Sequence, residues 1–293
     1  MSMYLNNYNK KEKERKKTIK SLWNDSKLKN LDNKSIKFKT ARDCSSLYLF
    51  YKYAWSRLNI KVNNSLDIGC GTGIQMSLIL DNKLVNFVKG IDFSPGAIEK
   101  CKKFMKYCDH NNFDLMTIDF ELFETKKKYD LISAIQVINY LESLDLFFSK
   151  IDTLLLNGGY LIISDGQNKK NFSFIHMVKS NNLVRKIFGY HKLSKKYPDP
   201  LVFPKKVIDI RKMALKYNYK LIDIIYKNTY LTSYLEKICF FLSKKSIRNQ
   251  PLRIFLGIIY KLLSLIIFFE NFILKNFSLG GQYFCYLKKK EIN

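Results

Sequence analysis

Three glycines at alternate positions follow a short apolar run in this 293-residue chain. Residues 66–73 read Leu-Asp-Ile-Gly-Cys-Gly-Thr-Gly, and a helical pattern begins at Ile74. Glycine at such a strand-to-helix turn permits backbone conformations and a close ligand approach that a Cβ atom would block. Dinucleotide-binding loops space their glycines as G-x-G-x-x-G/A, which would require a small residue in place of Ile74. The spacing therefore indicates a ligand-binding loop and disfavours a dinucleotide.

The elements that must position this loop alternate between short apolar runs and helical patterns. Such alternation predicts parallel strands joined by right-handed crossovers, with ligands at the carboxyl ends of the strands. We expect an α/β fold: a three-layer, doubly wound, mostly parallel seven-stranded sheet with an antiparallel last strand, plus a helical lid and an apolar helical insertion before that strand. The expected strands are residues 65–68, 87–91, 113–118, 129–135, 160–164, 220–225 and 282–287, and the expected helices are residues 47–58, 74–80, 95–107, 141–156, 171–190 and 205–217.

With the glycine loop set in this order of elements, the chain resembles the class I, Rossmann-like S-adenosylmethionine-dependent methyltransferases. Residues 66–73 are similar to the first signature of that family, in which an acid and the glycine loop receive the methionine and ribose parts of the cofactor. The resemblance covers residues 47–164 well and the last two strands loosely. It implies that S-adenosyl-L-methionine is the cofactor.

The ends of later strands also match the family. Asp92 would accept hydrogen bonds from both ribose hydroxyls, because a vicinal diol offers two donors and a carboxylate has two acceptor oxygens. Phe93 would lie against the adenine, Asp119 would meet the adenine amino group, and Phe120 would line the adenine plane. The residues that the resemblance places at the cofactor are Asp67, Gly69, Cys70, Gly71, Gly73, Asp92, Phe93, Asp119, Phe120, Gln136 and Val137.

The expected reaction is an in-line displacement, to which an enzyme contributes mainly positioning and desolvation of the nucleophile. A general base is optional, so the catalytic residues stay undetermined. His176 and His191 in the expected lid are weak candidates, since imidazole suits proton transfer near neutral pH. Tyr140 and Asp165, just beyond the fourth and fifth strands, are comparable candidates. No metal is expected, because the cysteines and histidines lack zinc-site spacing.

Motifs of several methyltransferase subclasses are missing after the fourth strand. Residues 136–139 read Gln-Val-Ile-Asn, where enzymes that modify exocyclic amines of nucleobases carry Asn/Asp/Ser-Pro-Pro-aromatic. We therefore expect a small-molecule or lipid-like acceptor, in the broad group that resembles the quinone-biosynthesis methyltransferases. Two alternatives stay open: an RNA methyltransferase that uses a lysine-rich surface, and a non-catalytic protein that retains the fold.

The charge balance bears on the RNA alternative. The chain carries 51 Lys and Arg against 25 Asp and Glu, for a formal net charge of +26, but only seven of these residues are Arg. Arg is the side chain suited to bidentate recognition of phosphates and base edges. A compositional surplus of lysine is therefore the favoured explanation, with nucleic acid a less favoured partner and an anionic membrane surface an alternative one.

The expected organisation is a basic polar arm (residues 1–40), a methyltransferase core with a lid at about 166–204 (residues 41–227), an apolar helical insertion (residues 228–280), and the last strand with a basic tail (residues 281–293). The run 254–269 contains one charge, Lys261, but is shorter than the ~20 residues that a span requires. We expect core, lid or peripheral membrane contact for this insertion. Without a secretory signal at residues 1–20, and with cysteines that indicate a reducing compartment, the expected location is cytoplasmic, with membrane association as an alternative.

Overall fold

The computed structural model describes residues 46–141, 143–166, 205–227 and 282–291, together with isolated positions between 259 and 269. The expected arm at residues 1–40, nearly all of the lid at 166–204 and most of the insertion at 228–280 lie outside the described residues. So do the catalytic candidates His176 and His191.

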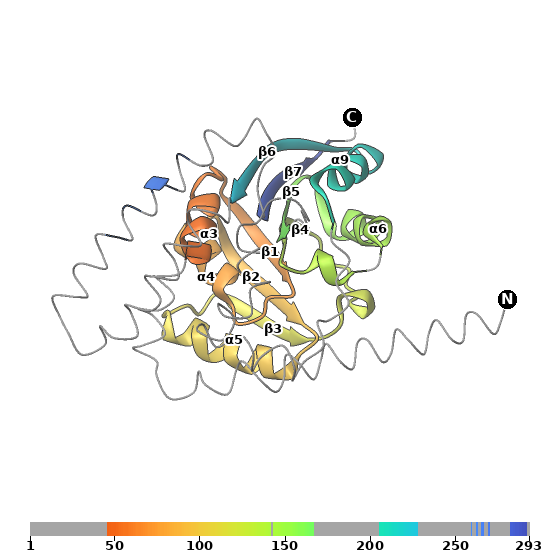
Figure 1. The fold of residues 1–293 in the computed structure, drawn as a ribbon. Coiled ribbons are helices and arrows are strands. Elements are labelled where there is room, and N and C mark those ends of the chain that lie inside the picture. Colours follow the sequence, from red (N-terminus) through yellow and green to blue (C-terminus); the bar gives the residue numbers. More distant parts are fainter. Residues whose placement is uncertain are drawn as a thin grey trace, which may run out of the picture.

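A seven-stranded sheet with the order β3-β2-β1-β4-β5-β7-β6 forms the centre of the molecule (Figure 1). Its β7 pairs antiparallel with both β5 and β6, and the other pairs are parallel. The predicted α/β sheet with an antiparallel last strand is thus confirmed. From β1 the strand order runs to β3 at one edge of the sheet, and from β4 it continues toward the other edge. A crevice is expected at the carboxyl ends of β1 and β4, where the order changes direction. The strands are β1 (Val62–Ile68), β2 (Val85–Asp92), β3 (Phe113–Thr117), β4 (Tyr129–Ile135), β5 (Leu155–Gly166), β6 (Tyr219–Lys227) and β7 (Gln282–Lys289).

Helices cover both faces of the sheet (Figure 1). One face carries α3 (Ser46–Ser56), α4 (Ile74–Asp81) and α5 (Pro95–Tyr107), and the other carries α6 (Leu144–Leu154) and α9 (Val207–Lys216). Two short 3-10 helices, η2 (Phe120–Leu122) and η3 (Ile138–Tyr140), follow β3 and β4. The apolar core correspondingly forms two clusters, one on each face of the sheet. This is the expected three-layer architecture.

The helix predicted at residues 141–156 is shorter in the structure. Ser143 caps α6, since its Oγ accepts a hydrogen bond from the Leu146 N–H at 3.3 Å. At the other end Leu155, which is fully buried, already belongs to β5 and pairs with Tyr129. Gly158 then adopts a left-handed conformation (φ +74°) within the strand. The apolar pattern of this segment is shared by helix and strand, which is why the sequence placed the boundary too late.

Aromatic packing fixes α3 against the sheet. Trp55 meets Phe284 of β7 edge-on, with ring centroids 5.3 Å apart and planes at 86°. The Tyr286 hydroxyl donates a hydrogen bond to the Ala54 carbonyl at 2.7 Å. Such paired aromatic contacts favour a single orientation of the helix. The end of α3 that carries Ala54 and Trp55 is therefore held in place.

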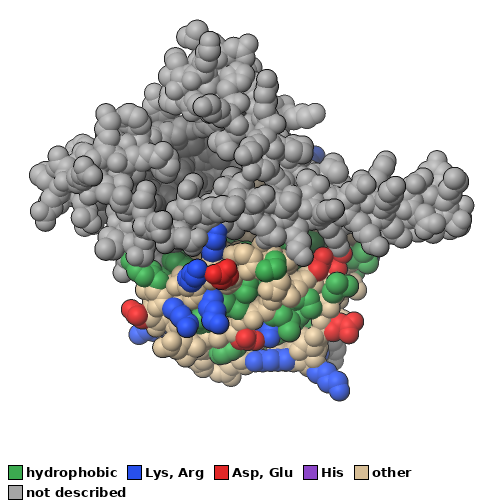
Figure 2. All heavy atoms as spheres, turned by 90° about the horizontal axis from the view of Figure 1, so that it is seen from below, with side chains coloured by type: hydrophobic (Ala, Val, Ile, Leu, Met, Phe, Trp, Pro, Cys, Tyr) green, Lys and Arg blue, Asp and Glu red, His purple; other side chains and the backbone are tan. Residues whose placement is uncertain are grey.

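Figure 2 shows the face that carries α5, where basic, acidic and apolar side chains of the described residues are interspersed. Lys103 pairs with Glu99 at 3.0 Å on α5, and Lys89 pairs with Asp114 at 2.7 Å across β2 and β3. Within the described part of this face, the lysine surplus does not gather into one basic patch.

Candidate cofactor and active site

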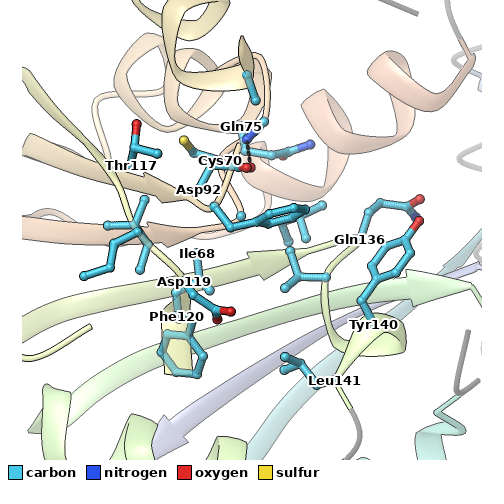
Figure 3. Close-up of a pocket in the computed structure, with 18 of the residues that line it drawn as sticks. Ile68, Cys70, Gln75, Asp92, Thr117, Asp119, Phe120, Gln136, Tyr140 and Leu141 are labelled. Atoms are coloured by element: carbon cyan, nitrogen blue, oxygen red, sulfur yellow. Dashed lines mark hydrogen bonds between the residues drawn. The ribbon is translucent and has the colours of Figure 1, made fainter. Parts of the chain in front are cut away.

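A cavity of about 850 Å³ opens at the carboxyl ends of β1, β2, β3 and β4. Its volume is within the range of sites for drug-sized molecules. In Figure 3, Asp119 and Phe120 lie at the lower left of the cavity, Gln136 and Tyr140 at the right, and Cys70 and Asp92 at the top. The structure thus brings most of the residues expected at a cofactor around one space.

All three loop glycines have left-handed backbone conformations, with φ of +64° at Gly69, +54° at Gly71 and +85° at Gly73. A Cβ atom at Gly69 would lie 2.4 Å from Val137 Cγ2, and one at Gly73 would lie 2.7 Å from Cys101 Sγ. At Gly71 the nearest heavy atom to such a Cβ would be the Gly69 carbonyl oxygen, 3.9 Å away. Two of the glycines therefore permit internal packing, while Gly71 leaves space open beside the cavity that it lines.

Asp92 joins the glycine loop to the start of α5. Its Oδ2 accepts a hydrogen bond from the Gly71 N–H at 3.0 Å, and its Oδ1 accepts one from the Ser94 N–H at 2.9 Å. Burial raises the pKa of this carboxyl group, and the two N–H donors oppose the shift. Each oxygen retains capacity for a further donor. The carboxylate is thus suited to the ribose diol that the resemblance assigns to it.

Asp67 lies beneath the loop and is not among the residues that line the cavity. It is fully buried, and its Oδ1 accepts a hydrogen bond from the Ser133 hydroxyl at 2.6 Å. Its Oδ2 has no hydrogen-bond partner in the described part of the chain. Burial raises the pKa of Asp67 to about 7, and the nearby charge of Asp92 acts in the same direction. The side chain therefore supports the loop from behind in this structure.

Asp119 and Phe120 form the end of the cavity that is expected to hold the adenine. Asp119 caps η2, since its Oδ1 accepts a hydrogen bond from the Glu121 N–H at 3.0 Å. Phe120 is mostly buried and packs against Phe147 of α6, with ring centroids 5.7 Å apart. Phe93 also lines the cavity. A flat apolar surface beside a carboxylate suits an aromatic base with an exocyclic amine.

The opposite end is shaped by the turn after β4. Gln136 has φ +63°, unusual for a residue with a Cβ atom, and its N–H donates a hydrogen bond to the Ser164 carbonyl at 2.6 Å. Strained residues of this kind cluster at functional sites. In Figure 3 the Gln136 amide and the Tyr140 hydroxyl point toward one another. Burial and the charge of Asp165 raise the pKa of Tyr140, so its hydroxyl stays protonated at neutral pH and is able to donate a hydrogen bond.

Asp165, a catalytic candidate from the sequence, is held by the backbone and by Asn139. Its Oδ2 accepts from the Asn139 N–H at 2.9 Å, and its Oδ1 accepts from the Asn139 amide at 2.6 Å and the Gly166 N–H at 2.8 Å. Burial raises its pKa to about 6. Asp165 does not line the cavity, so this structure supports a structural role for the carboxylate.

Sequence reasoning missed two residues of this region, Asn139 and Gln75. Asn139 had appeared only as a departure from a nucleobase-amine motif. Gln75 lines the cavity, and its Oε1 accepts a hydrogen bond from Trp55 Nε1 at 2.7 Å. The sequence signal that could have identified Gln75 was a polar residue in the first turn of the helix after the glycine loop.

Two further searches concern only the described ranges of the chain. Within them, no group of three or more His, Cys, Asp or Glu side chains is placed to hold a metal ion. Nor does any helix in those ranges have the length and apolar character needed to cross a membrane.

The comparisons with known proteins agree with this geometry. Residues 61–205 match the family model described as a methyltransferase domain. The chain is 28% identical to the ubiquinone biosynthesis O-methyltransferase of Pelagibacter ubique, over 78% of this chain and 96% of that protein. It is 32% identical to malonyl-[acyl-carrier protein] O-methyltransferase 1 of Ilyobacter polytropus, over 38% of this chain and 41% of that protein. Several curated relatives are thus matched over less than half of their own length.

Among solved structures, the cyclopropane synthase MmaA2 of Mycobacterium tuberculosis shares the fold, with a TM-score of 0.51 and 18% identity over 82% of each chain. The matched domain contains the glycine loop, Asp92 and the turn at Gln136, which together surround the cavity. The chain therefore belongs to the class I S-adenosylmethionine-dependent methyltransferases.

Proposed function

We propose that this chain transfers the methyl group of S-adenosylmethionine to an oxygen atom of a small-molecule or lipid-like acceptor. The observation that carries the proposal is the cradle formed by Gly71 and Asp92: a left-handed glycine that leaves space beside the cavity, hydrogen-bonded to a carboxylate that can accept a ribose diol. The names of the two O-methyltransferase relatives support oxygen as the acceptor atom.

When bound, the cofactor supplies an electrophilic methyl group on a sulfonium. The chain's own residues hold and desolvate the reactants. Val137 and Leu141 place apolar surface at the end of the cavity formed by Gln136 and Tyr140, and such surface excludes water. The amide of Gln136 and the protonated Tyr140 hydroxyl can donate hydrogen bonds to an acceptor oxygen and orient it.

The carboxylates of the cavity bear on the type of acceptor. Asp92, Asp119 and Glu121 are the acidic residues among the described lining; Asp92 ends β2, and the other two lie in the segment after β3. The described lining from β4 and η3 therefore contains no ionised base. A carboxylate or an acidic hydroxyl arrives already deprotonated and needs no base, so the proposal includes both as acceptors.

The test begins with calorimetric titration of the protein with S-adenosylhomocysteine, for which we expect 1:1 binding. Incubation with methyl-labelled S-adenosylmethionine and a panel of carboxylic acids, phenols and amines would then identify the acceptor class. We expect label in products that release methanol in base, as methyl esters do, or in stable aryl ethers. Failure of the protein to bind S-adenosylhomocysteine, or labelling of amines alone, would contradict the proposal.

We also propose that the insertion at residues 228–280 brings the site to an anionic membrane, where a lipid-like acceptor would reside. The support is an exposed apolar row at helical spacing: Leu262, Leu265 and Phe269 are 53%, 54% and 58% exposed. Co-sedimentation with vesicles of anionic phospholipid should fall at least severalfold when all three are changed to Ser. The control is Leu146→Ser on α6, where Leu146 is 73% exposed. Equal partitioning of the triple variant and the control would reject membrane contact.

A further inference from the structure

The hydrogen bond between Trp55 and Gln75 determines which way the Gln75 amide faces. Trp55 Nε1 lies 2.7 Å from the amide oxygen of Gln75. An indole N–H is a donor only, so the oxygen of the amide must face Trp55 and its NH2 group must face elsewhere. That NH2 group has no hydrogen-bond partner in the part of the chain that the structure describes, although Gln75 lines the cavity. Two oriented N–H donors are thus left for a ligand.

The surroundings of Gln75 favour a negatively charged partner. Gln75 is in the first turn of α4, which begins after Gly73, has no side-chain cap and contains no acidic residue in that turn. The first N–H groups of a helix lack intrahelical acceptors, and the helix dipole adds a positive field there. The Gln75 NH2 group and the end of α4 therefore act together on the same side of the cavity, beside the glycine loop.

We infer that Gln75, oriented by Trp55, binds the carboxylate of the amino-acid part of the cofactor. The inference rests on the proposed function, which makes S-adenosylmethionine the ligand. Its adenine and ribose have their expected partners in Asp119 with Phe120 and in Asp92, and Figure 3 shows Gln75 near Cys70, away from Asp119 and Phe120. The ammonium group of the cofactor is itself a donor and cannot use the Gln75 NH2 group. The carboxylate is the acceptor that remains.

Two ligands separate this role from a general effect on the loop. S-adenosylhomocysteine carries the amino-acid carboxylate, and 5′-methylthioadenosine lacks it while keeping adenine, ribose and the thioether. Calorimetry with Gln75→Leu should show a loss of about 10- to 100-fold in affinity for S-adenosylhomocysteine, as expected for a hydrogen bond to a charged group. Affinity for 5′-methylthioadenosine should stay within about twofold, since its partners are unchanged.

Gln75→Glu sharpens the test. The Glu carboxylate can still accept from Trp55, but it presents a negative charge where the NH2 group was, so the loss for S-adenosylhomocysteine should exceed that of Gln75→Leu. Trp55→Phe, checked for folding by its melting temperature, should release the amide and give an intermediate loss. Adding Trp55→Phe to Gln75→Leu should cost little more affinity for S-adenosylhomocysteine than Gln75→Leu alone.

The possible results distinguish a failure of the inference from a failure of the proposed function. Equal losses for both ligands in Gln75→Leu would show that Gln75 acts on loop structure, and unchanged affinity for both would show that it does not contact the ligand; either result overturns the inference while the proposed function stands. Absence of S-adenosylhomocysteine binding to the unaltered protein would overturn the proposed function itself.

Discussion

Asn139 and Asp165 bind each other through both backbone and side chain at the carboxyl edge of the sheet. The Asn139 N–H and amide donate to the two carboxylate oxygens at 2.9 and 2.6 Å. The same amide donates to the Gly166 carbonyl at 3.0 Å, and its oxygen accepts from the Lys205 N–H at 2.9 Å. One side chain after β4 thereby fixes the end of β5 and the approach to α9.

Asn139→Leu should lower the free energy of unfolding by about 3 kcal/mol, because three side-chain hydrogen bonds are lost and a buried carboxylate loses a donor. Urea denaturation at pH 7 would measure the change. Asn86→Leu is a matched control, since Asn86 makes one exposed hydrogen bond to Asn63; it should change stability by less than about 0.5 kcal/mol. A similar loss in both variants would contradict the role assigned to Asn139.

Gly71→Ala should separate folding from ligand binding. Its Cβ would meet no heavy atom closer than 3.9 Å, so the fold should lose only the ~1–2 kcal/mol of a left-handed alanine. The methyl group would nevertheless enter the space beside the cavity, and affinity for S-adenosylhomocysteine should fall at least ~10-fold, a difference of about 1.4 kcal/mol. Melting temperature and calorimetry report the two effects.

Gly69→Ala provides the contrast, because its Cβ would lie 2.4 Å from Val137 Cγ2. This variant should lose clearly more stability than Gly71→Ala, as internal overpacking does. If Gly71→Ala bound S-adenosylhomocysteine as tightly as the unaltered protein, Gly71 would not face the ligand.

The raised pKa of Asp67 predicts a pH dependence of stability. Its folded-state pKa of about 7 lies above the ordinary aspartate value of 3.8, so between these pH values the folded state keeps a proton that the unfolded state releases. The free energy of unfolding should therefore fall as pH rises from about 4 to 7 and level off above that. Asp165, with a pKa raised to about 6, contributes a slope of the same sign.

Asp67→Asn keeps an oxygen for the Ser133 hydroxyl and removes the titration. The variant should lose much less stability than the unaltered protein between pH 5 and pH 8, by a margin of more than about 1 kcal/mol. Denaturation curves at the two pH values would measure the margin. Parallel losses in the two proteins would show that Asp67 is ionised in the folded state across this range.

Buried tyrosine hydroxyls on the two faces of the sheet provide a further stability test. Tyr226 and Tyr283 have hydroxyls without a hydrogen-bond partner in the described ranges, whereas the Tyr286 hydroxyl donates to the Ala54 carbonyl at 2.7 Å. Tyr226→Phe and Tyr283→Phe should each leave stability unchanged or raise it by up to about 1 kcal/mol, because a polar group no longer has to be buried. Tyr286→Phe should lose about 1 kcal/mol. Thermal unfolding would rank the three, and the reverse order would contradict the assignment.

The sequence by itself determined the features that depend on local chemistry. Alternation of apolar runs with helical patterns predicted the α/β class and most strands, and the glycine spacing before Ile74 predicted the ligand loop. Asp92 and Asp119 were identifiable because each ends a strand-like run, and the carboxyl ends of parallel strands meet at one edge. The C-terminal end of α6 was predicted wrongly because Leu155 and Leu156 fit a helix and a buried strand equally well.

Only the tertiary structure decided which polar groups meet. Parallel pairing of β1 with β4 sets Asp67 opposite Ser133, so the strand register decides which hydroxyl donates to this buried carboxylate. Trp55 reaches Gln75 across 20 residues of sequence, and Asn139 reaches Asp165 across 26. Partners so far apart in sequence are chosen by strand register and helix packing, and no local pattern encodes either of these. The glycine loop is thus a local property of the sequence, whereas the orientation of the groups around it is a property of the fold.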